Sequence, residues 1–371
     1  MSDATTRDDA TVLLRVERGL ARATLHRPRA INALDHHMVL ALAGALDSWE
    51  KDESVSVVLI DGAGDRGLCA GGDIRAIRAS ALDGDGEAAR FWRDEYHLNA
   101  RIARYAKPYV AFMDGVVMGG GVGVSAHGGF RVVTERATVG MPETTIGFVP
   151  DVGGTHLLSR APGQVGTHMA LTGTPVGAAD ALYAGLADHY VPSERLSDLA
   201  AALTDAESEA AVLATVGRFA ESAPAGTLAD RRSWIDTCYS ADTAEEIVER
   251  LRAHGDPEAA EAAATIVGKS PSSVKTTLAA LRRARALDTL EEVLEQEYRV
   301  SCAVLAWPDL VEGIRAQVID KDRSPRWSPS TLAEVDTAVV EAAFAPAPDG
   351  PLGLAEPRLP RADPDVRGRP G

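Results

Sequence analysis

Three short, almost unbroken apolar runs constrain the fold of this chain more than any other feature. They cover residues 55–60, 109–113 and 130–133. Short apolar runs without a polar residue at every second position are typical of strands buried on both faces of a sheet. Residues 34–51, before the first run, carry apolar side chains at helical spacing, and residues 87–105 are also predicted to be helical. Strands that helices cover on both faces indicate an α/β fold.

The order of the predicted elements divides the chain into regions. A unit of strand, strand and helix recurs roughly every 50 residues in the first half, which begins with a predicted hairpin. From about Gly153 onward, alanine-rich helical stretches dominate. We therefore expect a flexible N-terminus (1–11), a core with the active site (12–191), a helical C-terminal region (192–345) and a disordered tail (346–371) that is rich in Pro, Gly, Arg and Asp.

The composition argues against several classes of partner. The 371 residues carry a formal net charge of −16, with a pI near 5.0, so the surface repels nucleic acid and anionic membranes. Three widely separated cysteines argue against a zinc site or a disulfide framework. The polar, acidic start does not resemble a signal peptide, and no apolar run is long enough to cross a membrane. Only five of the 38 basic residues are lysines, which is typical of a GC-rich bacterial source, and we expect a cytoplasmic protein.

Two glycine-rich segments can expose backbone N–H groups to a ligand. One is CAGGD at residues 69–73, a loop that runs into a helix with Asp73 placed to cap it. The other is MGGGVG at residues 118–123, which follows a predicted strand and opens a second helix. Helix N-termini favour developing negative charge. If each segment donates one N–H to the same oxygen, the two form an oxyanion hole.

A third segment, MPETTIGFVPDVGG at residues 141–154, supplies two carboxylates, Glu143 and Asp151. The surrounding residues are apolar and are interrupted by proline and glycine. Such surroundings raise the pKa of a carboxyl group and suit it to general acid–base work. Taken alone, each acid has a plainer explanation, as a helix-start residue or a turn residue. The order and spacing of the three segments together favour the catalytic interpretation.

Other chemical signals in the sequence are weaker. Gly121-x-Gly123-x-x-Ala126 matches a dinucleotide-binding fingerprint with Glu143 as its acid, but Pro142 breaks any strand that would present this acid. No Gly-x-Ser-x-Gly nucleophile motif occurs.

Two further residues with reactive side chains are given structural roles. Cys69 is interpreted as a packed thiol, and His127 as a helix-surface or core histidine rather than a base.

The segments together resemble the crotonase (enoyl-CoA hydratase/isomerase) superfamily over residues 12–191. The resemblance rests on HRPRAINAL (26–34), the 70–74 loop, KPYVA (107–111), the triple glycine and Pro142-Glu143. It implies an α/β spiral of strand–strand–helix turns, followed here by the helical C-terminal region. It also implies a CoA thioester as substrate and the N–H groups of Gly72 and Gly120 as oxyanion donors.

One departure from the superfamily pattern points to a particular branch. Enoyl-CoA hydratases carry one catalytic glutamate at the position of Gly123, and their second one matches Glu143. The chain is more similar to the 3-hydroxyisobutyryl-CoA hydrolase branch, over residues 12–345. The matching segments are MPET and PDVGG around the two acids, RDEYHLN (93–99), EYR (297–299), EGIRA (312–316) and IDKDRSPRW (319–327).

This second resemblance implies a reaction and a set of site residues. The implied reaction converts a short-chain 3-hydroxyacyl-CoA thioester, 3-hydroxyisobutyryl-CoA, to 3-hydroxyisobutyrate and CoA in valine catabolism. The implied catalytic or substrate-binding residues are Glu95, Gly120, Glu143 and Asp151, with Gly72 as the second oxyanion donor. The implied CoA-binding residues are Ala30, Ala70, Asp73 and Ile74. Because CoA is anionic, Arg29 and Lys321 are added as candidate basic contacts.

Alternatives remain open at this point. The chain can still be an enoyl-CoA hydratase or isomerase of the same superfamily, or a non-catalytic acyl-CoA-binding protein. The hydrolase scheme needs no metal and no cofactor other than the CoA of its substrate. Since hydratase relatives form trimers, a homo-oligomer is also open.

Overall fold

The computed structural model describes residues 10–354 of the chain, and most of the predicted elements are present. The strands are β1 (Val12–Glu17), β2 (Leu20–Leu25), β3 (Val57–Gly62), β4 (Tyr109–Met113), β5 (Val116–Met118), β6 (Phe130–Val133), β7 (Thr138–Gly140) and β8 (His189–Tyr190). The helices of the first half are α1 (His36–Lys51), α2 (Ile74–Asp83), α3 (Glu87–Ala103), α4 (Gly120–Ser125), α5 (Gly154–Ser159), α6 (Val165–Thr172) and α7 (Ala178–Tyr183).

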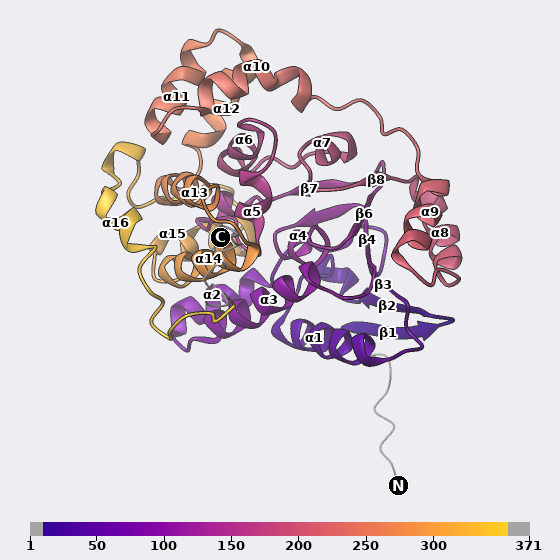
Figure 1. Cartoon of the computed structure of the whole chain (residues 1–371). Coiled ribbons are helices and arrows are strands. Elements are labelled where there is room, and N and C mark those ends of the chain that lie inside the picture. The colour runs from indigo at the N-terminus through magenta and orange to yellow at the C-terminus, as the bar shows by residue number, and fades with distance from the viewer. Residues whose placement is uncertain (1–9, 355–371) are drawn as a thin grey trace, which may run out of the picture.

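The second half of the described chain is almost entirely helical, as the sequence predicts. Its helices are α8 (Leu196–Leu203), α9 (Glu209–Phe219), α10 (Leu228–Tyr239), α11 (Ala244–Ala253), α12 (Pro257–Val267), α13 (Pro271–Ala284), α14 (Leu290–Val304), α15 (Pro308–Ile314) and α16 (Thr337–Ala342). Figure 1 shows α8 and α9 beside the large sheet, and α10–α16 grouped on the opposite side of the molecule.

The strands form two sheets that share the turns of a spiral. The larger sheet has the order β1-β2-β3-β4-β6-β8, and the smaller one pairs β5 with β7. Among the described strands of this sheet, only β1 is antiparallel to its neighbour, β2. Two turns add one strand to each sheet and then a helix, namely β4-β5-α4 and β6-β7 followed by α5, whereas β2 and β3 are each followed by helices without a strand in the smaller sheet. The predicted fold class is confirmed. The triple glycine follows directly after the carboxyl end of β5.

The central strands are buried on both faces, as their unbroken apolar runs predict. In β3, Val57 and Leu59 pack in a cluster with helices α8 and α9, which contribute Leu199 and Val212. The intervening Val58 and Ile60 pack in the main core with helices α1 and α3. Because side chains alternate along a strand, one short run serves both layers.

The predicted disordered tail is wrong for residues 346–354. Leu352 is buried, and the N–H groups of residues 352–354 donate hydrogen bonds to the Glu295 carboxylate at 2.5 to 3.0 Å. Arg93 donates to the carbonyl of Pro351 at 2.9 Å, which ties the segment to α3. One apolar anchor and a buried acceptor are enough to order a segment whose composition resembles a linker. Residues 355–371, and residues 1–9 of the predicted flexible N-terminus, lie outside the described residues.

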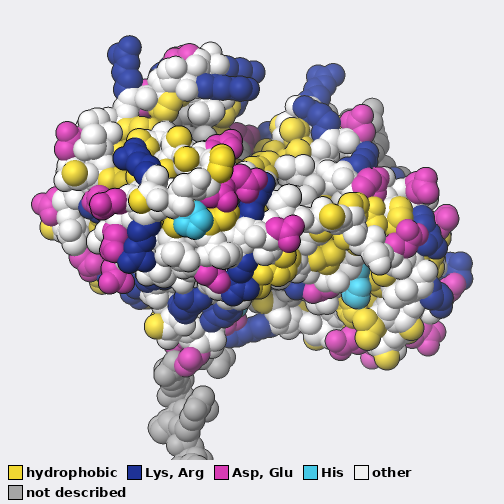
Figure 2. All heavy atoms as spheres, turned by 90° about the horizontal axis from the view of Figure 1, so that it is seen from above, with side chains coloured by type: hydrophobic (Ala, Val, Ile, Leu, Met, Phe, Trp, Pro, Cys, Tyr) yellow, Lys and Arg dark blue, Asp and Glu magenta, His cyan; other side chains and the backbone are white. Residues whose placement is uncertain are grey.

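The charged side chains of the surface bear on the predicted choice of partners. On the face drawn in Figure 2, basic and acidic side chains are interspersed, and no broad basic patch is visible. Within residues 10–354, no helix combines the length and the apolar character needed to cross a bilayer.

Candidate active site

A cavity of about 190 Å³ lies where the three predicted segments meet. Residues of the 70–74 loop, Gly119 and Gly120, and residues of the 142–152 segment line it together with α3. The rings of Trp92 and Phe148 form part of its wall, and they stack on each other with ring centroids 5.2 Å apart. The walls are largely apolar, so polar groups that face the cavity interact in surroundings that contain little water.

The two glycine-rich segments approach each other closely beside this cavity. A Cβ on Gly120 would lie 3.4 Å from the Gly72 nitrogen and only 2.7 Å from Glu95 Oε1, so a side chain at position 120 would collide with the carboxyl group. Among the described residues, neither the Gly72 nor the Gly120 amide donates a hydrogen bond to a protein acceptor. Two unpaired N–H groups therefore lie close together on the cavity wall, where they can bind a ligand oxygen.

Three carboxyl groups, those of Glu95, Glu143 and Asp151, are buried around the same cavity. Within residues 10–354 none of them forms an ion pair, and one oxygen each of Glu95 and Glu143 lacks a hydrogen-bond partner. Burial, with repulsion from Asp151, raises the pKa of Glu95 and of Glu143 well above the ordinary value. Burial also raises the pKa of Asp151 to about 7. Asp151 therefore exchanges its proton near neutral pH, which suits acid–base chemistry.

Asp151 differs from the other two acids because, among the described residues, it alone of the three accepts a hydrogen bond from a side-chain hydroxyl group. The Tyr96 hydroxyl of α3 donates to Asp151 Oδ2 at 2.7 Å, and Ser301 Oγ of α14 lies 2.8 Å from the Tyr96 oxygen. With the Tyr96 proton directed at Asp151, the Ser301 hydroxyl donates to Tyr96. This relay stabilises the ionised form of Asp151, so Asp151 ionises more readily than its neighbours.

The residues predicted to hold CoA differ in their relation to the cavity. Ala70 and Ile74 line it directly. Asp73 occupies the N-cap position of α2 but makes no capping bond, because its carboxylate pairs with Arg27 at 2.9 Å. The short helical turn Pro28–Ala30, which includes Arg29 and Ala30, is exposed, and Ile31 at its end accepts a hydrogen bond from the Ala70 amide at 2.9 Å.

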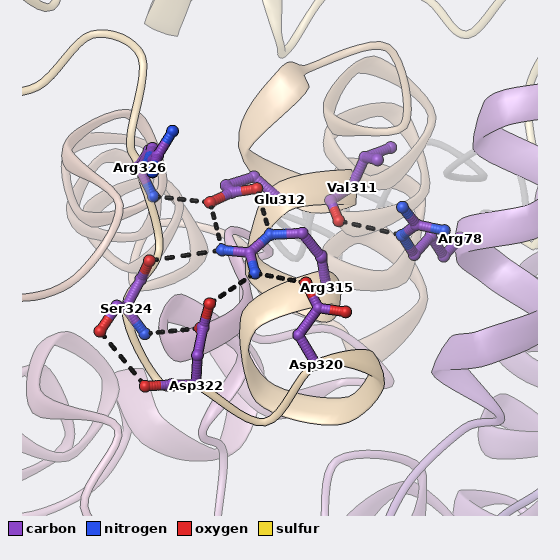
Figure 3. Close-up of polar contacts among 8 residues, drawn as sticks. All are labelled: Arg78, Val311, Glu312, Arg315, Asp320, Asp322, Ser324 and Arg326. Atoms are coloured by element: carbon purple, nitrogen blue, oxygen red, sulfur yellow. Dashed lines mark hydrogen bonds and ion pairs between the residues drawn. The ribbon is translucent and has the colours of Figure 1, made fainter.

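Lys321 is exposed and does not line the cavity, although Gln317 of the same segment does. Gln317 lies in a π-helical turn, Arg315–Ile319. Figure 3 shows that the Arg315 guanidinium holds this segment together through acceptors on four residues, the carboxylates of Glu312, Asp320 and Asp322 and the carbonyl of Ser324. Arg75 of α2 donates to the Val318 carbonyl at 2.9 Å. The Arg315 cluster thus fixes a polar cavity residue that comes from the C-terminal region.

Two predictions about ordinary residues are confirmed. Cys69 is buried, and burial raises the pKa of its thiol to about 12, so it is a packed thiol. His127 lies 2.7 Å from the Val152 carbonyl, and burial lowers its pKa to about 4, so it is neutral. In residues 10–354, no group of three His, Cys, Asp or Glu side chains is placed to hold a metal ion.

Sequence reasoning missed the residues that the helical region contributes. Gln317 reaches the cavity, Ser301 reaches Tyr96, and Glu297 accepts hydrogen bonds from the turn after Asp151. The only available signal was the resemblance of residues 297–299 and 312–316 to hydrolases, which gave no roles. The division into a catalytic core (12–191) and a separate helical region therefore does not describe the site.

Position 123 has no room for the glutamate that hydratases carry there. A Cβ on Gly123 would lie 2.7 Å from Val152 Cβ and 2.9 Å from Asn99 Nδ2. Both neighbours are buried, and the Val152 side chain is rigid. The space for a second acid is closed at this point, and Asp151 supplies a second carboxyl group from the following turn.

Replacing Gly123 with alanine should therefore destabilise the protein. Overpacking of a buried site costs about 1–3 kcal/mol, and Tm should fall by several degrees in a thermal melt. Gly217 of α9 is a matched control, since it is exposed and nothing lies within 4 Å of a Cβ there. Its change to alanine should leave Tm unchanged or slightly higher. Equal Tm values for the two variants would contradict the steric argument.

The fold and site define an enzyme with buried acid–base groups, and comparisons with known proteins identify its family. The sequence profile of the enoyl-CoA hydratase/isomerase family matches residues 20–344. The mitochondrial 3-hydroxyisobutyryl-CoA hydrolase of Danio rerio is 41% identical over 331 residues, which are 87% of this chain and 86% of that one. The chain therefore belongs to the enoyl-CoA hydratase/isomerase family.

Two solved bacterial structures are similar over most of their length. A carnitinyl-CoA dehydratase from Mycobacterium thermoresistibile is 54% identical with a TM-score of 0.88, covering 92% of this chain and 98% of that one. An enoyl-CoA hydratase from Rhodobacter sphaeroides 2.4.1 is 41% identical with a TM-score of 0.87, covering 92% and 99%. The names of the relatives thus differ in reaction, so the choice between reactions depends on the site.

Proposed function

We propose that this enzyme hydrolyses 3-hydroxyisobutyryl-CoA to 3-hydroxyisobutyrate and CoA, a step in valine breakdown. The observation that carries the proposal is that Glu143 and Asp151 line the same cavity as the two glycine amides, while position 123 carries a glycine instead of an acid. The hydrolase from Danio rerio, similar over 87% of this chain, supports the same reaction.

The first requirement of the reaction is polarisation of the thioester carbonyl. The unpaired N–H groups of Gly72 and Gly120 bind the carbonyl oxygen, which becomes negative when the tetrahedral intermediate forms. Two such donors in surroundings poor in water stabilise that charge by several kcal/mol. The neighbouring Glu95 favours the protonated form, so it does not repel the oxyanion.

The second requirement is an oxygen nucleophile, and the third is a proton for the leaving thiolate. Because Asp151 ionises most readily, it takes up the proton of the attacking water or fixes the substrate, while protonated Glu143 donates a proton to the sulfur. In the alternative division, ionised Glu143 attacks the carbonyl carbon and forms a mixed anhydride, which water then cleaves. Both schemes need one ionised and one protonated carboxyl group. The pKa of about 7 for Asp151 and the well-raised pKa of Glu143 support the scheme in which Asp151 is the ionised group.

The acyl group is recognised by the remaining polar residues of the cavity. Glu95, with an unpartnered oxygen, and Gln317 are available to bind the 3-hydroxyl group. The Trp92 and Phe148 rings contact the aliphatic part. A small cavity with one or two polar groups fits a short-chain 3-hydroxyacyl group rather than a long fatty acyl chain.

The second candidate function is hydration or isomerisation of an enoyl-CoA, because two similar solved structures carry hydratase or dehydratase names. Hydration in this superfamily uses an acid at the position of Gly123, and Val152 and Asn99 occupy that space here. Isomerisation needs only a single base, which Glu143 can supply. A third candidate, a non-catalytic acyl-CoA-binding protein, does not account for three buried carboxyl groups that destabilise the fold.

Release of free thiol distinguishes these candidates. We expect rapid thiol release from 3-hydroxyisobutyryl-CoA, slower release from 3-hydroxypropionyl-CoA and very little from palmitoyl-CoA, all measured with a thiol reagent. Hydratase or isomerase action on crotonyl-CoA would change the absorbance of the enoyl group without releasing thiol. Tight binding of CoA with no turnover on any of these substrates would show a binding protein instead.

Three further properties belong to the same proposal. The reaction needs no separate cofactor, because two amides and two carboxyl groups supply all of its steps. Arg29 and Lys321, both exposed, are candidate contacts for the CoA phosphates. The enzyme is cytoplasmic, as the arginine-rich composition indicates, and the acyl-CoA is its partner, with a homo-oligomer as an open possibility.

A further inference from the structure

The turn that carries Asp151 has a backbone conformation that its sequence disfavours. Val152 has a φ of +52°, and Gly153 follows with a φ of +79°. Positive φ is unusual for any residue with a side chain, and for a β-branched residue such as valine it costs on the order of 1–3 kcal/mol. This conformation persists only if the surrounding structure holds it.

Contacts from distant parts of the chain hold the turn. Glu297 of α14 accepts a hydrogen bond from the Gly153 amide at 2.6 Å with one carboxylate oxygen. Its other oxygen accepts from the Thr155 amide at 2.9 Å and from the Thr155 hydroxyl at 2.6 Å. The neutral His127 side chain donates to the Val152 carbonyl at 2.7 Å. The peptide group between Val152 and Gly153 is thus held from outside the turn at both its N–H and its C=O, and the N–H of Thr155 is held two residues further on.

Burial of the Glu297 carboxyl group at this position destabilises the fold. Glu297 is only 1% exposed, and within residues 10–354 it forms no ion pair. Burial raises the pKa of Glu297 to about 8, although three hydrogen-bond donors oppose this shift. A buried carboxyl group that destabilises the fold and faces an active site commonly serves function rather than stability.

We propose that Glu297 is a positioning residue for Asp151, because it clamps the strained Val152 turn that directs the Asp151 carboxyl group into the cavity. The clamp and the Tyr96 relay come from one face of α14, since Glu297 and Ser301 are four residues apart. Helix α14 therefore sets both the backbone and the hydrogen-bond donor of Asp151. This inference rests on the proposed hydrolase function for its kinetic test.

Helix α14 also provides a matched control. Glu295 is likewise buried and also accepts three hydrogen bonds from backbone amides, but these come from residues 352–354, away from the cavity. Changing Glu297 or Glu295 to glutamine replaces a buried carboxyl group of the same helix with an amide of the same shape. In either variant an NH₂ group replaces one acceptor oxygen, so one backbone donor loses its partner.

The experiment compares Glu297→Gln with Glu295→Gln in the full-length chain. We expect Glu297→Gln to lower kcat for thiol release about 10- to 100-fold with KM within about threefold, because Asp151 is displaced while the CoA-binding surface is intact. Glu295→Gln should keep kcat and KM near the wild-type values, even if its Tm falls by as much. A kcat for Glu297→Gln within about twofold of the wild type, or equal losses in both variants, would overturn the proposal.

Two further measurements keep the test independent of folding and of the proposed reaction. If Glu297→Gln does not fold, Thr155→Ser should retain kcat and Thr155→Val should lower it, because only serine keeps the hydroxyl that Glu297 binds. Amide hydrogen exchange should accelerate in residues 151–155 of Glu297→Gln and in residues 352–354 of Glu295→Gln. Unchanged exchange in residues 151–155 would refute the clamp. Absence of thiol release by the wild type would refute only the hydrolase function.

Discussion

Glu143→Gln should reduce thiol release from 3-hydroxyisobutyryl-CoA by at least about 100-fold, because the amide can neither donate a proton to the thiolate nor attack the carbonyl. The amide has the same shape as the carboxyl group. Since Glu143 is buried and only one wall of the cavity changes, the affinity for CoA should stay within about threefold of the wild type. Steady-state kinetics and calorimetric titration with CoA measure the two quantities.

The control for this prediction is Glu135→Gln. Glu135 is an exposed carboxylate that accepts a hydrogen bond from the Ser193 amide at 2.9 Å, and it does not line the cavity. This variant should retain full turnover. Undiminished thiol release by Glu143→Gln would remove Glu143 from the mechanism. A loss of CoA affinity as large as the loss of kcat would assign it to binding.

Asp151→Asn should have two opposite effects: lower turnover and higher stability. The turnover should fall by at least about 100-fold, because the most readily ionised group of the cavity is lost. Asparagine can still accept the Tyr96 hydrogen bond, so the site should remain folded. The stability should rise because the buried carboxyl group, which the folded state holds in an unfavourable environment, is gone.

The sign of the stability effect depends on pH. The folded state raises the pKa of Asp151 from 3.8 to about 7, so the unfolded chain loses this proton at lower pH than the folded one. The contribution of Asp151 to the free energy of unfolding is therefore fully present below pH 3.8, and it is lost as the pH rises to about 7. Asp151→Asn should therefore increase Tm by about 2–4 °C or more at pH 8, and by much less at pH 5.

Asp188→Asn should show the opposite sign. Although burial opposes it, hydrogen bonds and the charge of Arg131 lower the pKa of Asp188, so its ionised form stabilises the fold at neutral pH. Its Tm should fall at pH 8, and less near pH 4. Thermal melts at three pH values test both variants, and a lower Tm for Asp151→Asn at pH 8 would show that the Asp151 carboxylate is favourably placed.

Much of the fold could be predicted because local patterns determine it. The run at residues 55–60 places alternate side chains in two layers, and this requires only a sheet with helices on both faces. The tail at 346–354 was mispredicted because Leu352 and the Glu295 carboxylate order it, and no local pattern reveals an acceptor 57 residues away. Asp73 has the sequence of a helix cap, but Arg27 takes its carboxylate.

The candidate site was predictable where neighbouring residues carry the chemistry. Five predicted site residues line the same cavity, namely Gly72, Glu95, Gly120, Glu143 and Asp151. Their partners Tyr96, Ser301 and Glu297 were not predicted. Each has an ordinary role when read alone, as a core aromatic or a helix residue. Only the three-dimensional arrangement shows that they act on Asp151.

The origin of Glu297 and Ser301 in α14 has a consequence for synthesis on the ribosome. Glu297 lies 144 residues after Gly153, and Ser301 lies 205 residues after Tyr96. While the spiral half emerges from the exit tunnel, the strained turn lacks its contacts with Glu297, and the Tyr96 hydroxyl lacks the Ser301 donor. A nascent chain that ends before α14 can form its sheets but cannot complete its catalytic centre. We therefore expect catalytic activity to appear only after α14 has been synthesised and has packed against the spiral half.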